Sequence, residues 1–328
     1  MVNENIVSSL YNLNTLINSW KENLPEINIL RERFLEKGQF INLINLSKKE
    51  INTIVEAGKI VAVDGSRVEF GSFFPYYICL LKTLAKSTGY FDGEKHVDDF
   101  LALTPLDHKV FKEIEKSSID NKISIDESYR NYLKENLARM ELKTALTTIK
   151  KFNPSLIILD GGFLLFDKYP EWEELYQECI DKDIILVGLI EEIATSELAK
   201  WFNITVANRP RIYDRELLFG LFNQGEYINF HTGNRIKKDY CTVFGRLSSS
   251  PQAIACDFLP EQEHYVSNTM HLLYSLTPKQ GQGIPIWLQI VDAEVRLRKK
   301  EVDKLISTCI DSDTYQRYFK PNRENRIY

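Results

Sequence analysis

Two short apolar runs, each closed by an aspartate and a glycine, constrain the fold of this chain most strongly. The first is KIVAV at 59–63, followed by Asp64 and Gly65, and the second is SLIIL at 155–159, followed by Asp160 and a glycine pair. A third apolar run, DIILVGLI, occupies 183–190. Continuous apolar strands separated by helices are typical of a parallel sheet covered on both faces. The sequence therefore predicts an α/β fold.

The rest of the chain predicts what surrounds this sheet. Hydrophobic periodicity indicates helices at 6–46, 127–151, 172–180, 264–276 and 292–306, and further strands at 68–80, 227–231, 240–247 and 253–258. The strand before Asp64 and the segment 68–80 are expected to form a hairpin that delivers Asp64 to its turn. We expect an N-terminal helical extension at 1–50 and one α/β domain at 51–328, with an insertion of loops and short helix at about 91–124. Length alone would also permit two domains.

Composition restricts the kinds of site that this chain can hold. The 5 cysteines are scattered without zinc-ligand spacing, which disfavours a zinc ribbon or a disulfide framework. Any metal is therefore expected to have oxygen ligands, as magnesium and manganese do. No apolar run approaches the roughly 20 residues that span a bilayer, and the N-terminus does not resemble a secretory signal. We expect a cytoplasmic protein with no membrane contact.

Net charge argues against one class of nucleic-acid binder. The chain carries 46 acidic and 41 basic residues, a net charge of −5, which is unsuited to coating nucleic acid by bulk charge. Local contact with DNA remains compatible with this balance. Two basic runs occur, at 235–238 and 296–300, and each is interpreted more simply as a solvated face.

Three carboxylates are predicted to meet at one edge of the sheet. Asp64 and Asp160 each end an apolar strand, and ligands of α/β sheets bind beyond the carboxyl ends of strands. Asp-Gly is also a common turn dipeptide, so each motif alone is weak. Glu141 lies on a helix face whose neighbours include Leu137 and Ala145. An ionised carboxylate there is costly unless something pairs with it, although its stem could also carry it to water at the margin of the apolar stripe.

Converging carboxylates repel one another unless cations lie between them. Two metal ions about 3.5–4 Å apart are a standard device for hydrolysing phosphodiesters. The pattern therefore indicates metal-assisted phosphoryl chemistry. Other Asp-Gly enzymes fit less well, since haloacid-dehalogenase-type enzymes need a second aspartate two residues on, where this chain has Ser66, and actin-like ATPases need Asp-x-Gly. No phosphate-binding P-loop motif is present.

Five blocks in this order resemble the NurA nuclease family. They are IVAVDGSRVEF at 60–70, SLIILDGGFLL at 155–165 with Glu141 in the preceding helix, YDRELLFGLFNQGE at 213–226, VFGRLSS at 243–249 and GQGIPIWLQIVDAEVRL at 281–297. The resemblance extends from about 55 to 308. It implies an RNase H-like mixed sheet flanked by helices, a manganese-dependent nuclease acting on DNA ends and single strands, and a homodimer. It also implies a partner, the hexameric HerA-type ATPase, in DNA end resection and repair or in phage defence.

The resemblance also implies roles for particular residues. Asp64, Glu141 and Asp160 carry over as catalytic ligands of Mn²⁺ or Mg²⁺, with two ions expected. Asp292 falls at the C-terminal catalytic position, where many relatives have histidine. An aspartate there could bind metal directly or through water but could not act as an imidazole acid or base. Its alternative role is the N-cap of the final helix.

Some positions depart from the family pattern. Glu191 and Glu192 follow the third apolar strand, where relatives often have a basic residue. Arg67 or Lys200 could supply the missing phosphate contact. The next candidates for DNA contact are Arg215 and Arg246, for which structural salt bridges are an equal alternative.

Two other functions remain open at this point. One is a regulatory subunit of the ATPase whose own chemistry has decayed, which the departures at 191, 192 and 292 favour and the three retained carboxylates oppose. The other is a phosphotransferase or phosphatase that uses the same metals on a small substrate.

Overall fold

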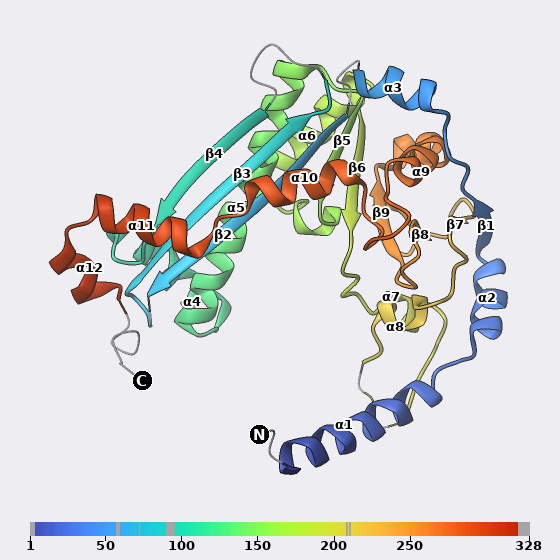
Figure 1. Cartoon of the computed structure of the whole chain (residues 1–328), viewed down its shortest axis with the longest axis horizontal. Coiled ribbons are helices and arrows are strands. Elements are labelled where there is room, and N and C mark those ends of the chain that lie inside the picture. Colours follow the sequence, from blue (N-terminus) through green and yellow to red (C-terminus); the bar gives the residue numbers. More distant parts are fainter. Residues whose placement is uncertain are drawn as a thin grey trace. The chain divides into compact units, whose positions relative to one another are not determined.

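The computed structural model describes residues 4–56, 60–71, 73–89, 96–207, 209 and 211–320. The chain divides into two compact units, each built from two segments. Unit 1 comprises Met1–Leu46 and Ile190–Pro285, and unit 2 comprises Ser47–Leu189 and Ile286–Tyr328. Figure 1 labels their helices and strands. Among the helices in the described ranges, none has the length and apolar character needed to cross a membrane.

Unit 2 contains a mixed sheet in which the strands follow the order β6-β5-β2-β3-β4 (Figure 1). The strands are β2 (Ile60–Gly71), β3 (Tyr77–Ser87), β4 (His96–Leu103), β5 (Leu156–Asp160) and β6 (Ile185–Ile190). The first three form an antiparallel meander, and β5 and β6 join it in parallel. Parallel neighbours require crossover connections, which helices supply here.

Helices cover both faces of this meander. The helices of unit 2 are α3 (Lys48–Glu56), α4 (His108–Asn121), α5 (Ile125–Phe152), η1 (Phe163–Leu165), α6 (Pro170–Asp181), α10 (Ile286–Val295), α11 (Lys299–Cys309) and α12 (Ser312–Tyr318). Both α5 and α10 contact β2 and β3. Gly65 faces Leu137 and Glu141 of α5, whereas the Ser66 hydroxyl accepts a hydrogen bond from Leu297 N at 3.1 Å. Because successive strand residues face opposite sides, α5 and the α10–α11 segment lie on opposite faces.

Unit 1 contains an antiparallel group of strands in the order β1-β7-β8-β9. Its elements are α1 (Glu4–Glu22), α2 (Ile27–Leu35), β1 (Gly38–Asn42), α7 (Glu197–Trp201), α8 (Asp214–Leu218), β7 (Glu226–Phe230), β8 (Cys241–Arg246), β9 (Ile254–Phe258), η2 (Pro260–Tyr265) and α9 (Val266–Ser275). Phe34 of α2 is fully buried in its apolar core. The Arg31 guanidinium donates two hydrogen bonds, of 2.8 and 2.9 Å, to the Glu226 carboxylate, and this pair joins α2 to β7.

Most predicted elements of the α/β pattern are confirmed within a few residues. The exceptions have physical causes. The segment 6–46 is not all helix, because Gly38–Asn42 pairs with β7 as strand β1. Asp64 is not at a hairpin turn: β2 continues to Gly71, since it is hydrogen-bonded to β3 along that length. The segment 91–124 includes strand β4 and helix α4 as well as loops, and residues 91–95 lie outside the described ranges.

The predicted final helix at 292–306 is two helices. The chain leaves helical structure after Val295, where Leu297 N donates to Ser66 instead of to a carbonyl one turn earlier. Asp292 consequently lies inside α10, and the N-cap role considered for it is wrong. The predicted boundary between an N-terminal extension at 1–50 and a nuclease domain at 51–328 stays a prediction.

Candidate active site

Strand register brings Asp64 and Asp160 to the same edge of the unit 2 sheet. Parallel pairing of β2 with β5 ends at Val63 and Leu159, and each aspartate is the next residue of its strand. Asp160 is the last residue of β5, after which Gly161, at φ 122°, turns the chain away. Asp64 remains inside β2 and is only 7% exposed. The two side chains thus leave neighbouring strands at one level.

Glu141 approaches β2 from α5, at the residue that follows Asp64. Its side chain is 7% exposed, in the middle of the buried face of the helix. A Cβ atom built on Gly65 would lie 2.1 Å from Glu141 Oε1 and 2.8 Å from Leu137 Cδ1. The absence of a side chain at position 65 therefore leaves room for the Glu141 carboxylate against β2.

The pKa values show that these carboxyl groups act on one another. Burial and the charge of Asp160 raise the pKa of Asp64 to about 7, with a further contribution from Asp292. The Gly65 N–H opposes this rise by donating to Asp64 Oδ1 at 2.6 Å. Burial, followed by the charges of Asp64 and Asp160, raises the pKa of Glu141 well above its ordinary value. Desolvation and like-charge repulsion are the two causes, as expected for acids that are buried together.

Asp292 lies at the margin of this cluster. It projects from α10, its side chain is 47% exposed, and it accepts a hydrogen bond from Arg296 Nη2 at 2.8 Å. A solvated ion pair within one helix turn contributes little to stability. Its electrostatic effect on Asp64 nevertheless places it in range of the site.

The donor chemistry of the cluster fits a hard divalent cation. Carboxylate oxygens are the ligands that Mg²⁺ and Mn²⁺ prefer, and a cation between them would relieve the repulsion that raises their pKa values. Within the part of the chain that the structure describes, no three acidic, histidine or cysteine side chains already converge as a metal-binding group. The assignment of Asp64, Glu141 and Asp160 as metal ligands stays a prediction.

The predicted DNA contacts fall into two groups. Arg67 is exposed on β2 and faces the same side as Gly65, two residues or about 7 Å along the strand. Lys200, Arg215 and Arg246 belong to unit 1. Lys200 pairs with Glu197 at 2.8 Å, and Arg215 is exposed on α8. Each of these DNA contacts stays a prediction.

Arg246 has a clear structural role. Its guanidinium donates to the carbonyl oxygens of Phe222, Ser248, Ser249 and Ser250 at 2.6–3.2 Å, which organises the turn after β8. The sequence interpretation missed two other cations of unit 1, Arg209 and Arg211. The run RPRIYDRE, from Arg209 to Glu216, was a visible signal of clustered positive charge.

A β-meander followed by two parallel strands, with helices on both faces and acidic residues on β2, α5 and β5, defines an RNase H-like α/β fold. The chain matches the NurA domain over residues 58–297 and belongs to that family, which is a family of nucleases. Both the family resemblance and the fold expected from the sequence are thereby confirmed.

One solved structure agrees with this assignment at the level of fold, and two others show weaker similarity. The crystal structure of the NurA nuclease from Sulfolobus solfataricus is similar over 96% of each chain, with a TM-score of 0.55 and 14% sequence identity. Endonuclease V from Bacillus subtilis matches with a TM-score of 0.40 and 10% identity, over 88% of this chain and 96% of that one. Drosophila Piwi matches with a TM-score of 0.33 and 9% identity, over 73% of this chain and 29% of its own. No curated protein sequence matches this chain.

Gly65→Ala tests the close approach of α5 to β2. The added methyl would displace the Glu141 carboxylate, and we expect Mn²⁺ affinity, measured by calorimetry, to fall about tenfold or more. Gly281→Ala is the matched control, because the nearest atom to its added Cβ would lie 3.8 Å away. Unchanged Mn²⁺ affinity in a folded Gly65→Ala protein would show that Glu141 is not a ligand.

The raised pKa of Asp64 makes stability depend on pH in the metal-free protein. The folded state holds a proton on Asp64 up to a pKa of about 7, whereas the unfolded chain releases it near 3.8. The stabilisation due to this shift is complete below pH 3.8 and is lost as pH rises to about 7. Asp64→Asn removes the effect, so in EDTA this variant should melt above wild type at pH 8 and lose that advantage near pH 4. A melting difference that does not vary with pH would contradict the assignment.

Proposed function

We propose that this chain is a divalent-metal-dependent deoxyribonuclease that hydrolyses phosphodiester bonds in the cytoplasm. The observation that carries the proposal is the cluster of acids formed by the buried Asp64 and Glu141 and the half-buried Asp160, on β2, α5 and β5 of an RNase H-like fold. Membership of a nuclease family supports the same chemistry. Buried acids whose charges raise one another's pKa values are characteristic of functional sites.

Each residue of the cluster has a distinct task in this proposal. Asp64, Glu141 and Asp160 would hold two Mn²⁺ or Mg²⁺ ions, which when bound supply an activated water and stabilise the leaving oxygen. The strand and helix positions fix where the three carboxylates point, so little reorganisation is needed on binding DNA. Asp292 is half-exposed and its charge contributes to the raised pKa of Asp64, and in this proposal it binds a metal directly or through water. Arg67 is the candidate phosphate contact on β2.

The substrate and partners follow from the family resemblance. We propose that the enzyme acts on duplex ends and single strands of DNA, together with a HerA-type hexameric ATPase, in end processing for repair or in phage defence. We also propose a homodimer. Helix α1 supports this, because Leu10, Leu13 and Ile17 lie on one side of it and are 60%, 49% and 48% exposed. Apolar side chains grouped in this way on a helix are typical of a protein interface.

Cleavage of end-labelled single- and double-stranded DNA tests the nuclease. Reactions with Mn²⁺, Mg²⁺ or EDTA, each with and without a HerA-type ATPase, should show cutting only with metal. Asp64→Asn and Glu141→Gln should each lower the rate at least about a hundredfold, since each removes a carboxylate from the metal site. Glu135→Gln is the matched control, because Glu135 lies on the same helix but is half-exposed and pairs with Arg139 at 3.8 Å.

If the folded protein binds the ATPase yet cuts DNA in none of these conditions, the nuclease proposal fails. The regulatory subunit is then the better description. Cutting that persists in both acidic-site variants would instead move the active site elsewhere.

The dimer is tested through α1. Leu10→Glu combined with Leu13→Glu should convert a dimer to a monomer in light scattering after gel filtration, because charges replace the apolar contact. Asn12→Glu combined with Thr15→Glu adds the same charge to the polar side of the helix and should leave the dimer intact. A wild-type protein that is monomeric at all concentrations would refute the proposed homodimer.

A further inference from the structure

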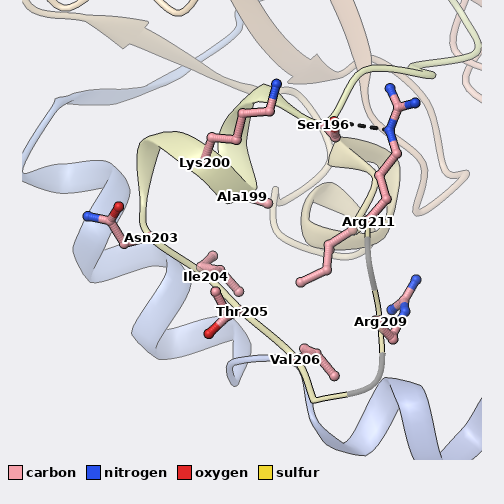
Figure 2. A pocket seen from close by; sticks show the side chains of 10 residues that line it. Ser196, Ala199, Lys200, Asn203, Ile204, Thr205, Val206, Arg209 and Arg211 are labelled. Atoms are coloured by element: carbon pink, nitrogen blue, oxygen red, sulfur yellow. Dashed lines mark hydrogen bonds between the residues drawn. The ribbon is translucent and has the colours of Figure 1, made fainter.

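A second candidate binding site lies in unit 1 and includes none of the carboxylates of β2, α5 and β5. It is a pocket of about 700 Å³ between α7, the segment after it and the approach to α8 (Figure 2). Its lining contains three cations, Lys200, Arg209 and Arg211, and no carboxylate. Ile204, Val206 and Ile212 contribute an apolar wall and are themselves buried in the core of unit 1.

Arg209 carries an unsatisfied hydrogen-bond donor at this pocket. Its side chain is 8% exposed, its Nη2 donates to Glu216 Oε1 at 2.9 Å, and its guanidinium lies 5.1 Å from the centre of the Trp20 ring. Its Nη1 is buried and, among the described residues, has no hydrogen-bond partner. Leaving a charged donor buried and unpaired is costly, so native proteins rarely do so without a ligand or water to accept. The missing partner is expected to be an oxygen.

Arg211 and Lys200 add positive charge that other groups of the protein neutralise only weakly. Arg211 donates from Nε to Ser196 Oγ at 3.1 Å and lies over the Tyr213 ring, and within the described ranges no carboxylate is at ion-pair distance from it. In the view of Figure 2, the Lys200 and Arg211 side chains extend in the same direction on either side of Ser196. Lys200 pairs with Glu197, but both are exposed, and such a pair is worth little.

The buried carboxylate of Asp214 connects the two short helices, α7 and α8, on either side of the pocket lining. Asp214 is fully buried at the start of α8 and accepts hydrogen bonds from Thr195 Oγ1 at 2.5 Å, Leu198 N at 2.9 Å and Glu197 N at 3.1 Å. These bonds tie the first turn of α7 to α8, and the described residues between the two helices contribute most of the pocket lining. The cations are therefore displayed on a fixed frame, which reduces the entropy lost when a ligand binds.

We propose that this pocket binds the phosphate monoester of a nucleotide, with Arg209 and Arg211 as the principal donors and Lys200 as a third positive charge. Guanidinium groups match the oxygens of phosphate in a two-pronged arrangement, and Arg209 Nη1 gains the acceptor that it lacks. The volume falls within the range of small-ligand sites, and the apolar wall can contact a sugar or base. The phosphate can belong to a free nucleotide or to the phosphorylated end of a strand.

Calorimetric titration of the full chain in EDTA tests this site without engaging the metal ligands. The probes are dAMP, deoxyadenosine, inorganic phosphate, and a short oligodeoxynucleotide with and without a 5′-phosphate. We expect phosphorylated probes to bind more tightly than their unphosphorylated counterparts. Arg209→Gln and Arg211→Gln should each weaken that binding at least about tenfold, as loss of a charged hydrogen bond does.

Three variants keep the result interpretable. Arg211 is exposed, so Arg211→Gln should fold even if Arg209→Gln, which removes the ion pair of the partly buried Glu216, does not. Arg235→Gln is the matched control, because Arg235 pairs with Glu263 at 3.3 Å and does not line this pocket. Asp64→Asn should bind the probes as wild type does, which separates this site from the proposed nuclease.

The outcomes discriminate between sources of the phosphate. Binding of dAMP identifies a free nucleotide as a sufficient ligand, whereas binding of the phosphorylated oligonucleotide alone identifies a strand end. Equal affinity for phosphorylated and unphosphorylated probes overturns the proposal. Affinities that change less than twofold in both arginine variants, or no binding of any probe at millimolar concentration, overturn it as well.

Discussion

Repulsion among buried carboxylates is the interaction around which unit 2 is arranged. Asp64 and Glu141 are each 7% exposed, and the charges of their neighbours and burial together raise both pKa values. Such a group would not persist in an ordinary core, because each charge lowers stability without a compensating partner. The fold fixes two of the acids on strands that are hydrogen-bonded to each other, and the third on a helix that packs against β2 and β3.

Strand β2 meets three separate requirements at adjacent positions. Asp64 follows the last residue paired with β5, Gly65 leaves room for the Glu141 carboxylate, and Ser66 receives the backbone N–H of Leu297. Because successive residues of a strand face opposite sides, the tripeptide Asp64-Gly65-Ser66 contacts both the α5 layer and the α10–α11 layer. One short motif thereby sets the position of an acid, of a long helix and of the C-terminal helices.

The sequence predicted this centre better than its surroundings. Continuous apolar strands and helical periodicity are local signals, and they predict the helix of Glu141 and the strand end at Asp160 correctly, whereas Asp64 lies inside its strand and not at the predicted end. Strand β1 was missed because its pairing with β7 is a contact between residues far apart in the chain. Lys237 was read as part of a solvated basic run but is buried, and its Nζ donates to Asp257 at 2.7 Å. Arg209 and Arg211 were missed for a related reason, since a pocket depends on tertiary packing that periodicity does not encode.

Placing Asp64 inside a strand, and not in a loop, has a consequence for the dynamics of the site. Loop residues move through local openings of low free energy, whereas residues in the centre of a sheet move only when a larger cooperative unit opens. Strand β2 is paired with β5 up to Val63, the residue before Asp64, and along its other edge it is paired with β3 at Asp64 itself. A ligand that binds the Asp64 carboxylate only in the folded state therefore raises the free energy needed to open the sheet. The amides of β2 should then exchange with solvent more slowly as the ligand occupancy rises.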